Sequence, residues 1–379
     1  MLECDFLIIG AGIAGAGAAY RLAPHGSTIL LDMEDQAGYH TTGRSAAFYA
    51  ETYGGPKVQP LTTASKAFFH NPPEGFTGVP LLTKLGAIHI YRADQKASAD
   101  RRFRELRAAL PGVKRLTAAE VKARVPHLDT CTIAGAIDDP DCGNLDVAAL
   151  HQGYLKAAKA MGAELRLGAR LETAAYDGRR WHVKTRQGAL NARFIINSAG
   201  AWGDEVAKRA GVMPLGLLPL RRTIVAVPKP DGLPFDRHGP VVLDIDEEYY
   251  FKPEGEGYLV TPADEVPSAP CDAQPELEDV ARAVQFFERA LDCTVARIDT
   301  KWAGLRTFGP DRTPVIGSAV DEPSFFWNVG QGGYGIQTSP AWSELLASLV
   351  RAVPLPDYLR QAGVEPGPYS PARFVSELA

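Results

Sequence analysis

The sequence is short of cysteine, of long apolar segments and of basic charge, and each shortage excludes a class of protein. Its 379 residues include five cysteines, an odd number with no C-x-x-C pair, which argues against a disulfide framework and against a zinc ribbon. The eight histidines show no metal-ligand spacing, so no metal is expected. Lys and Arg number 40 against 45 Asp and Glu, a net charge of −5, which argues against a nucleic-acid partner.

A membrane-spanning segment and a secretion signal are missing as well. The uncharged run nearest the N-terminus, residues 6–20, is too short to span a bilayer and is interrupted by glycines. No Lys or Arg precedes Arg21, so the basic start of a signal peptide is absent. Together with the unpaired cysteines, these features predict a cytoplasmic protein without a membrane span. At roughly 150 residues per domain, the length predicts two domains.

The start of the chain carries a nucleotide-binding pattern. Residues 5–9 form a short apolar run typical of a buried parallel strand, and Gly10, Gly12 and Gly15 follow in G-x-G-x-x-G spacing. A helical segment and a second apolar strand come next, and that strand ends in Asp32. The glycines allow close approach of a pyrophosphate, and the acid can accept from ribose hydroxyls. The pattern predicts NAD or FAD and argues against NADP, whose extra phosphate Asp32 would repel.

Helical and alternating segments continue along the chain. Helices are expected over residues 63–70, 97–110, 118–125, 146–161 and 277–291, and from Pro340 with Ser339 as cap. Strands are expected over residues 86–91, 164–167, 181–185 and 192–197, the last three as a meander beside the nucleotide sheet. The alternating segment 223–262 predicts an antiparallel sheet in a second domain.

Seven segments resemble the D-amino-acid oxidase superfamily of FAD enzymes, and bacterial FAD-dependent D-arginine dehydrogenases most of all. They are residues 10–15, 38–47, 67–76, 149–155, 197–202, 302–306 and 331–339, in order from one end of the chain to the other. The resemblance implies an α/β fold in which a Rossmann-like FAD-binding domain is interleaved with an α+β substrate domain containing an antiparallel sheet. The FAD-binding domain would comprise residues 1–80, 142–215 and 305–379, and the substrate domain residues 81–141 and 216–304.

The resemblance also implies FAD as cofactor, and no Cys or His stands out as a point of covalent attachment. The ADP half would lie on Gly10, Gly12, Ile13, Ala14, Gly15 and Asp32, with Leu171 meeting the adenine. Thr42, Gly43, Arg44, Ser45 and Ala47 would line the flavin side. The remaining contacts would come from Ala199, Gly200, Gly332, Gly333, Tyr334, Gly335, Ile336 and Gln337.

Two arginines and two tyrosines resemble the family's substrate site. Arg222 and Arg306 match its carboxylate-binding arginines, whose guanidinium groups can hold a carboxylate through two parallel hydrogen bonds. Tyr250 resembles the tyrosine that also touches that carboxylate, and Tyr53 resembles a pocket tyrosine on the loop after Ala47. The sequence leaves an alternative for each pair: the arginines could form buried ion pairs with internal acids, and the tyrosines could be ordinary half-buried core.

The expected side-chain pocket is apolar. Phe48 and Ala87 stand where relatives that prefer basic D-amino acids carry a histidine and an acid, and Val241 and Leu243 complete the pocket together with Gln337. A guanidinium buried there would lack its partner, which argues against D-arginine as the favoured substrate. The sequence therefore predicts a dehydrogenase that oxidises an apolar D-amino acid.

Several alternatives stay open. A secondary amine or a 2-hydroxy acid would also suit two arginines, and the fingerprint would also suit an NAD-dependent dehydrogenase or a flavin-binding module without catalysis. Residues 257–262, where sarcosine-oxidase-like members carry a lysine that promotes reaction with oxygen, contain none. This predicts electron transfer to a quinone or another acceptor.

Overall fold

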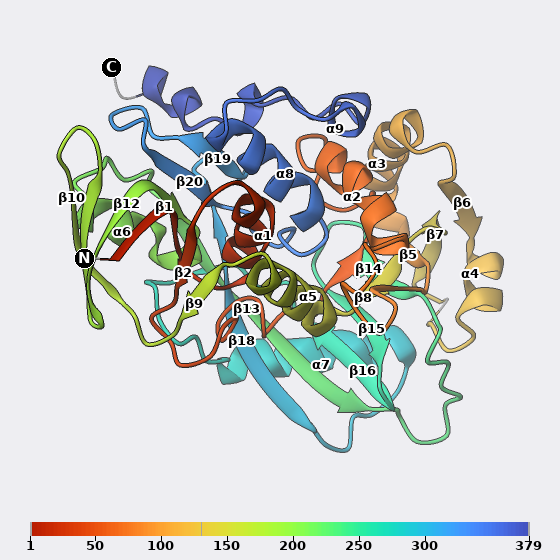
Figure 1. Cartoon of the computed structure of the whole chain (residues 1–379). Coiled ribbons are helices and arrows are strands. Elements are labelled where there is room, and N and C mark those ends of the chain that lie inside the picture. Colours follow the sequence, from red (N-terminus) through yellow and green to blue (C-terminus); the bar gives the residue numbers. More distant parts are fainter. Residues whose placement is uncertain (1, 130, 378–379) are drawn as a thin grey trace.

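The nucleotide pattern forms the parallel centre of a mixed sheet in the computed structural model, which describes residues 2–129 and 131–377 (Figure 1). β1 (Leu2–Ile9) lies between β2 (Thr28–Leu31) and β12 (Gly188–Asn197), and the three strands run parallel. Its side chains alternate between two apolar clusters: Leu7 packs in one and Ile8 in the other. Both faces of this sheet are therefore covered, as a parallel sheet requires.

Five further strands complete this first sheet. They are β9 (Glu164–Arg166), β10 (Leu171–Tyr176), β11 (Trp181–Thr185), β19 (Val315–Ser318) and β20 (Phe325–Val329). β10, β11 and β12 form an antiparallel meander, so the prediction that residues 164–167 begin it was wrong: its first strand is β10, which the sequence did not predict. β9 instead pairs parallel with β2 at the opposite edge, because it follows α5 (Val147–Ala160), which packs against the helix after β1.

A second sheet, mostly antiparallel, occupies the other half of the molecule (Figure 1). Its strands are β5 (Ala87–Arg92), β6 (Lys114–Thr117), β7 (Ile133–Asp139), β13 (Leu218–Pro228), β14 (Val241–Asp244), β15 (Tyr250–Glu254), β16 (Gly257–Thr261), β17 (Val266–Pro267) and β18 (Thr300–Phe308). β14 and β5 are its parallel pair. α7 (Leu277–Leu291) buries Val280, Ala283 and Phe287 against this sheet, and its bounds match the predicted helix.

A small third sheet links the two large ones. β3 (Phe48–Tyr49) and β4 (Leu82–Lys84) flank β8 (Gly143–Leu145), and all pairs are antiparallel. The predicted α/β fold class with an antiparallel second sheet is confirmed. The predicted division into domains stays a proposal, and β18 crosses its boundary at residues 304/305.

The remaining helices lie mostly around the first sheet and at the outer edge of the second (Figure 1). They are α1 (Ile13–Leu22), α2 (Gln59–His70), α3 (Lys96–Ala109), α4 (Ala118–Arg124), α6 (Gly203–Arg209), α8 (Ser339–Val350) and α9 (Asp357–Gln361). Short 3-10 turns cover Ala23–His25, Ala93–Gln95, Gly200–Trp202, Gly367–Tyr369 and Pro371–Glu377. The prediction of Ser339 as cap of the last helix was wrong: the helix begins at Ser339 and Thr338 precedes it, its hydroxyl donating back to the carbonyl of Tyr334.

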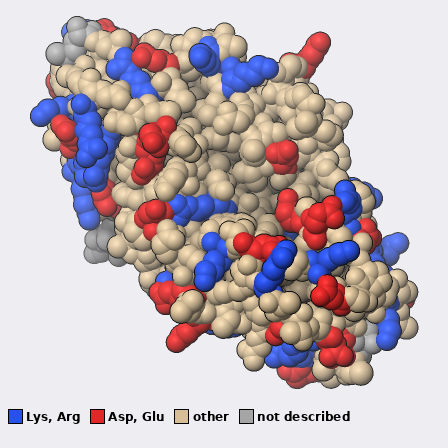
Figure 2. All heavy atoms as spheres, turned by 90° about the horizontal axis from the view of Figure 1, so that it is seen from below, with Lys and Arg blue, Asp and Glu red and all other residues tan. Residues whose placement is uncertain are grey.

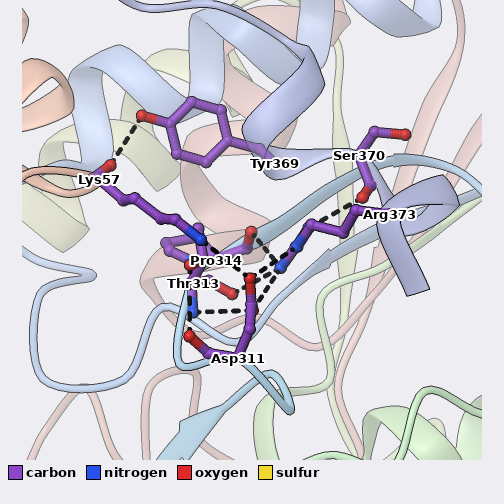
Figure 3. Close-up of polar contacts among 7 residues, drawn as sticks. All are labelled: Lys57, Asp311, Thr313, Pro314, Tyr369, Ser370 and Arg373. Carbon is purple, nitrogen blue, oxygen red and sulfur yellow. Dashed lines mark hydrogen bonds and ion pairs between the residues drawn. The ribbon is translucent and has the colours of Figure 1, made fainter. Parts of the chain in front are cut away.

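Hydrogen bonds and ion pairs connect the C-terminal segment to the turn that follows β18 (Figure 3). Arg373 Nη2 lies 3.0 Å from Asp311 Oδ1, and Lys57 Nζ lies 3.3 Å from Asp311 Oδ2. The hydroxyl of Tyr369 donates to the carbonyl of Lys57 at 2.8 Å. Asp311 thus joins the segment after β3, the turn after β18 and the C-terminus.

Acidic and basic side chains are interspersed on the face shown in Figure 2, so charges of one sign do not dominate it. No helix in the described part of the chain is long and apolar enough to cross a membrane. Nor does this part contain a group of three or more His, Cys, Asp or Glu that could hold a metal ion.

Candidate active site

One continuous cavity runs from the nucleotide pattern to the second sheet. Its volume is about 1750 Å³, including the space at its open mouth. Among the predicted residues, its lining includes Gly10, Gly12, Ile13, Ala14, Asp32, Thr42, Arg44, Ser45, Ala47, Phe48, Tyr53, Leu171, Ala199, Gly200, Arg222, Tyr250, Arg306, Gly332, Gly333, Gly335, Ile336 and Gln337. Both predicted sites therefore open into the same space.

Six predicted residues do not belong to this lining. They are Gly15, Gly43, Ala87, Val241, Leu243 and Tyr334. Gly15 has a packing reason: a Cβ there would lie 1.8 Å from the carbonyl oxygen of Gly10, so α1 could not start where it does. The structure thus separates glycines that face the cavity from one that lets the helix approach the sheet.

Asp32 is held by the backbone at the nucleotide end. The amide of Ala11 donates to its Oδ2 at 2.6 Å, and the amide of Glu34 donates to its Oδ1 at 2.9 Å. Burial raises the pKa of the Asp32 carboxyl, whereas these two hydrogen bonds act in the opposite direction. Asp32 lines the cavity, and each carboxylate oxygen has a further lone pair that can accept from a ribose hydroxyl.

Two side chains support the same turn, and the sequence did not predict either role. Thr42 Oγ1 accepts from the amide of Ile13 at 2.9 Å and so satisfies one free donor at the start of α1. His151 Nε2 lies 2.8 Å from the carbonyl oxygen of Ala11 and is buried. A buried helix histidine carries no local signal for such a contact, because its partner is 140 residues away in the sequence.

Arg44 and Gln337 bind other parts of the chain. Arg44 Nη1 donates to the carbonyls of Ala273 and Ala303 at 2.9 and 3.0 Å. Gln337 Oε1 accepts from the amide of Ala50 at 2.9 Å, and its Nε2 donates to the carbonyl of Tyr53 at 3.2 Å. Both line the cavity, but their polar atoms hold neighbouring segments in place.

The two predicted arginines come from adjacent antiparallel strands. Arg222 on β13 pairs with Gly304 on β18, so Arg222 and Arg306 are diagonal neighbours on one face of the sheet. Arg221 points to the opposite face and pairs with Asp279 of α7 at 2.9 Å. The register of β13 therefore directs Arg222, and not its neighbour, into the cavity.

Each guanidinium is held from several sides. Arg306 Nη2 donates to the hydroxyl of Tyr53 at 2.8 Å, and Arg222 Nε donates to the carbonyl of Asp264 at 2.7 Å. Burial, and then the charge of Arg306, lowers the pKa of Arg222. Burial, and then Tyr53, raises the pKa of Tyr250 to about 12, so its hydroxyl stays protonated and can donate.

An internal acid touches both arginines. Glu265 Oε1 lies 3.3 Å from Arg222 Nη2 and 3.6 Å from Arg306 Nη1. The ion pair that the sequence left open as an alternative is therefore present, but Glu265 does not line the cavity, whereas both arginines do. Free N–H groups remain on each guanidinium for a ligand.

The apolar residues expected to form a pocket form a closed cluster instead. Ala87, Val241 and Leu243 are 0%, 0% and 2% exposed and pack with Phe48 and Tyr53. The rings of Phe48 and Tyr53 lie 5.4 Å apart and face the cavity, so they separate the other three from it. The end of the cavity beside the arginines is thus lined by aromatic rings.

Known proteins resemble this chain in sequence and in fold. A family model described as FAD dependent oxidoreductase matches residues 5–349. Hydrogen cyanide synthase subunit HcnC of Pseudomonas aeruginosa is 24% identical, over 99% of this chain and 97% of its own length. Human mitochondrial dimethylglycine dehydrogenase is also 24% identical over 88% of this chain, which spans 41% of that protein. The crystal structure of glycine oxidase from Geobacillus kaustophilus matches with a TM-score of 0.84 and 20% identity, covering 98% of both chains.

Proposed function

This chain belongs to the FAD-dependent oxidoreductases of the D-amino-acid oxidase family, and on that premise we propose that it oxidises a D-amino acid with an uncharged side chain. FAD is its cofactor, which excludes the alternative of an NAD-dependent dehydrogenase. An amine or amino acid is its substrate class. One observation carries the proposal: the paired guanidinium groups of Arg222 and Arg306 open into the cavity that contains the nucleotide pattern.

The residues at the nucleotide end fit FAD. A Cβ at Gly10 would lie 2.5 Å from the carbonyl oxygen of Ser198, so any residue other than glycine would clash with the backbone in this turn. The start of α1 and the carboxylate of Asp32 provide donors for a pyrophosphate and acceptors for a ribose. When bound, FAD supplies the hydride acceptor. No cysteine is found among the described residues that line the cavity, and its histidine, His40, is hydrogen-bonded to Glu34, so non-covalent binding stays the expectation.

The substitution Asp32→Asn is expected to weaken FAD binding about tenfold to a hundredfold, because a hydrogen bond to a charged group contributes about 1.5–3 kcal/mol. The Asn side chain has only one acceptor oxygen. Its NH2 group would therefore face one of the two backbone N–H groups that now donate to the carboxylate, and two donors cannot bond to each other. Release of flavin on dilution, followed by fluorescence, measures the change. Asp35→Asn, at an exposed position three residues away, is the matched control, and equal losses in both variants would contradict the assignment.

The proposed chemistry needs a fixed carboxylate and an unprotonated amine. Arg222 and Arg306 would bind the carboxylate through parallel N–H groups and so direct the Cα–H toward the cofactor. Tyr53 accepts from Arg306, which leaves its own proton free to donate to the same carboxylate. Tyr250 is a second protonated donor. These groups hold the substrate in place, and the imino acid that leaves hydrolyses in water.

No general base is evident near the arginines. His40 is the one histidine among the described lining residues, and its Nε2 lies 2.9 Å from Glu34. The lining acids of the described chain are Asp32 and Glu205, and Glu205 lies 3.7 Å from Arg209, near the nucleotide end. The amine would therefore lose its proton to water, and position and electrostatics would supply most of the rate.

An anaerobic screen of D-amino acids for bleaching of the flavin tests the function, and D-leucine, D-methionine or D-phenylalanine is expected to exceed D-arginine in kcat/KM. A buried guanidinium without a partner carries a large desolvation cost, so the expected ratio is at least about tenfold. Phe48, Tyr53 and Ile224 face that part of the cavity, and none offers a charge. A wild-type enzyme that is fastest on D-arginine would overturn the specificity, and a flavin reduced by no amino acid or amine would overturn the function.

A secondary amine is the second candidate substrate. The similarity to human mitochondrial sarcosine dehydrogenase, 24% identical over 90% of this chain, supports it, because sarcosine is a secondary amine. The closed cluster around Ala87 also leaves no described opening for a long side chain there. Sarcosine, dimethylglycine and a 2-hydroxy acid belong in the same screen. Faster bleaching by sarcosine than by any D-amino acid would replace the first proposal with the second, and faster bleaching by a 2-hydroxy acid would contradict both.

The electron acceptor is expected to be a quinone or a dye in place of oxygen. No lysine lines the described part of the cavity, and Lys252 is buried against Asn144 and Glu254 on β15. With the best substrate, reduction of a quinone analogue should be much faster than formation of hydrogen peroxide in air. Rapid peroxide formation would contradict this prediction.

A further inference from the structure

Glu265 contacts both arginines but does not belong to the lining of the cavity. Its Oε1 is within 3.6 Å of a terminal nitrogen on each of them, yet only the arginines line the cavity. A ligand carboxylate in the cavity and the Glu265 carboxylate would therefore share the same pair of guanidinium groups.

Glu265 is itself held in place by a third guanidinium. Arg312 Nη2 lies 2.8 Å from Glu265 Oε1 and 2.9 Å from Oε2. Arg312 has a φ of 62°, a left-handed conformation that is uncommon for residues with a side chain. Arg312 lies in the turn after β18. The preceding residue in that turn, Asp311, forms ion pairs with Lys57 and Arg373 and so anchors the turn (Figure 3). The position of the Glu265 carboxylate is thus fixed from outside the cavity.

The charges of this cluster nearly balance. Arg222, Arg306 and Arg312 contribute three positive charges, and Glu265 contributes one negative charge. The carboxylate of Asp264 is adjacent in the chain and accepts from the amide and hydroxyl of Thr223 at 2.8 and 3.0 Å. With both acids ionised, one positive charge remains, which a ligand with a single carboxylate would neutralise.

We propose that Glu265 determines specificity for the number of carboxylates on the ligand. By holding one negative charge against both arginines, it lowers the positive potential of the cavity, so that a monocarboxylate binds well and a dicarboxylate gains little from its second charge. The inference rests on the proposed function, because it assumes that the substrate carboxylate binds Arg222 and Arg306. It goes further by assigning the discrimination to a residue that does not belong to the lining of the cavity.

Butyrate and succinate are matched probes, because they differ chiefly by one terminal carboxylate in place of a methyl group. Their dissociation constants can be measured on the holoenzyme from the perturbation of the flavin absorption spectrum. In Glu265→Gln, both ligands should bind more tightly, because the negative charge that repels their carboxylates is gone. Succinate should gain more than butyrate, so the preference for butyrate should fall by at least about fivefold, the size expected for two charges several ångström apart at an intermediate dielectric constant. An unchanged preference would overturn the proposal.

Arg312→Gln should shift the preference in the opposite direction, because it removes a positive charge from the same cluster. Its side chain is 48% exposed, so the variant also keeps the test decisive if Glu265→Gln does not fold. Glu256→Gln makes the same charge change at a side chain that is 81% exposed on another hairpin, and it should alter neither constant. Shifts of Glu265→Gln and Arg312→Gln in the same direction would overturn the proposal.

Arg306→Lys separates this inference from the proposed function. If the wild-type enzyme and Arg306→Lys bind butyrate equally well, the carboxylate does not bind the arginine pair, and the proposed function fails with the inference. If Arg306→Lys loses butyrate binding while Glu265→Gln keeps the wild-type preference, the carboxylate site stands and only the role of Glu265 fails.

Discussion

Replacing Arg306 by lysine is expected to lower kcat/KM for the best amino acid by at least about 30-fold. Truncating one partner of a buried, hydrogen-bonded charge pair costs about 2–5 kcal/mol, or roughly 30-fold to several-thousand-fold in rate. Lysine keeps the charge but lacks the planar fork, so it cannot bind a carboxylate and Tyr53 at once. Anaerobic flavin reduction in a stopped-flow instrument measures the change.

Arg221→Lys is the matched control for this substitution. Arg221 lies on the same strand as Arg222 but on the opposite face, where it pairs with Glu276 and Asp279. Its replacement is expected to lower thermal stability modestly and to leave kcat/KM near the wild-type value. If both variants lost activity equally, the loss would reflect damage to the β13–β18 pair, and the assignment of Arg306 to the carboxylate would be wrong.

The sequence predicted the fold because its signals are local. The glycine pattern, the acid that ends β2 and the amphipathic spacing of residues 277–291 each act within one element or one turn. The error at β9 has the opposite origin: its pairing with β2 depends on how α5 packs, and neither the strand nor its flanking turns record that. The family resemblance supplied the expectation of a second domain with an antiparallel sheet, and the interleaved division into domains stays a proposal.

Side-chain positions in the candidate site were harder to predict. The family resemblance placed Ala87, Val241 and Leu243 together in one pocket, and in the structure β14 and β5 pair Val241 with Ala87. Whether these three residues line the cavity depends on Phe48, which is distant from them in the sequence and packs against them in the structure. Glu265 was missed for the same reason, because its neighbours on β13 and β18 come together only when those strands pair.

The second large effect is expected at Gly333, whose missing side chain makes room for Arg306. A Cβ at this position would lie 1.4 Å from Arg306 Nη2 and 2.1 Å from its Cζ, so the guanidinium cannot keep its place beside an alanine. Gly333→Ala should therefore displace Arg306 from Tyr53 and Glu265 and lower kcat/KM by roughly a hundredfold, comparable to the loss of the buried hydrogen-bonded charge itself. FAD should remain bound, because the nucleotide turn is untouched. Gly78→Ala, where no atom lies within 4 Å of the added Cβ, is the control for a glycine replacement.

A double-mutant cycle shows whether Gly333 acts through Arg306. If its only role is to admit that guanidinium, Gly333→Ala should have little further effect in an Arg306→Lys background, because substitutions that act on the same group are not additive. Butyrate titration gives the same test without turnover, since the carboxylate should bind weakly in both single variants and in the double variant. Full additivity of the two losses would mean that Gly333 has an independent role, such as close approach to the cofactor. Loss of FAD from Gly333→Ala would point to the same conclusion, because a residue that only admits Arg306 has no reason to change cofactor affinity.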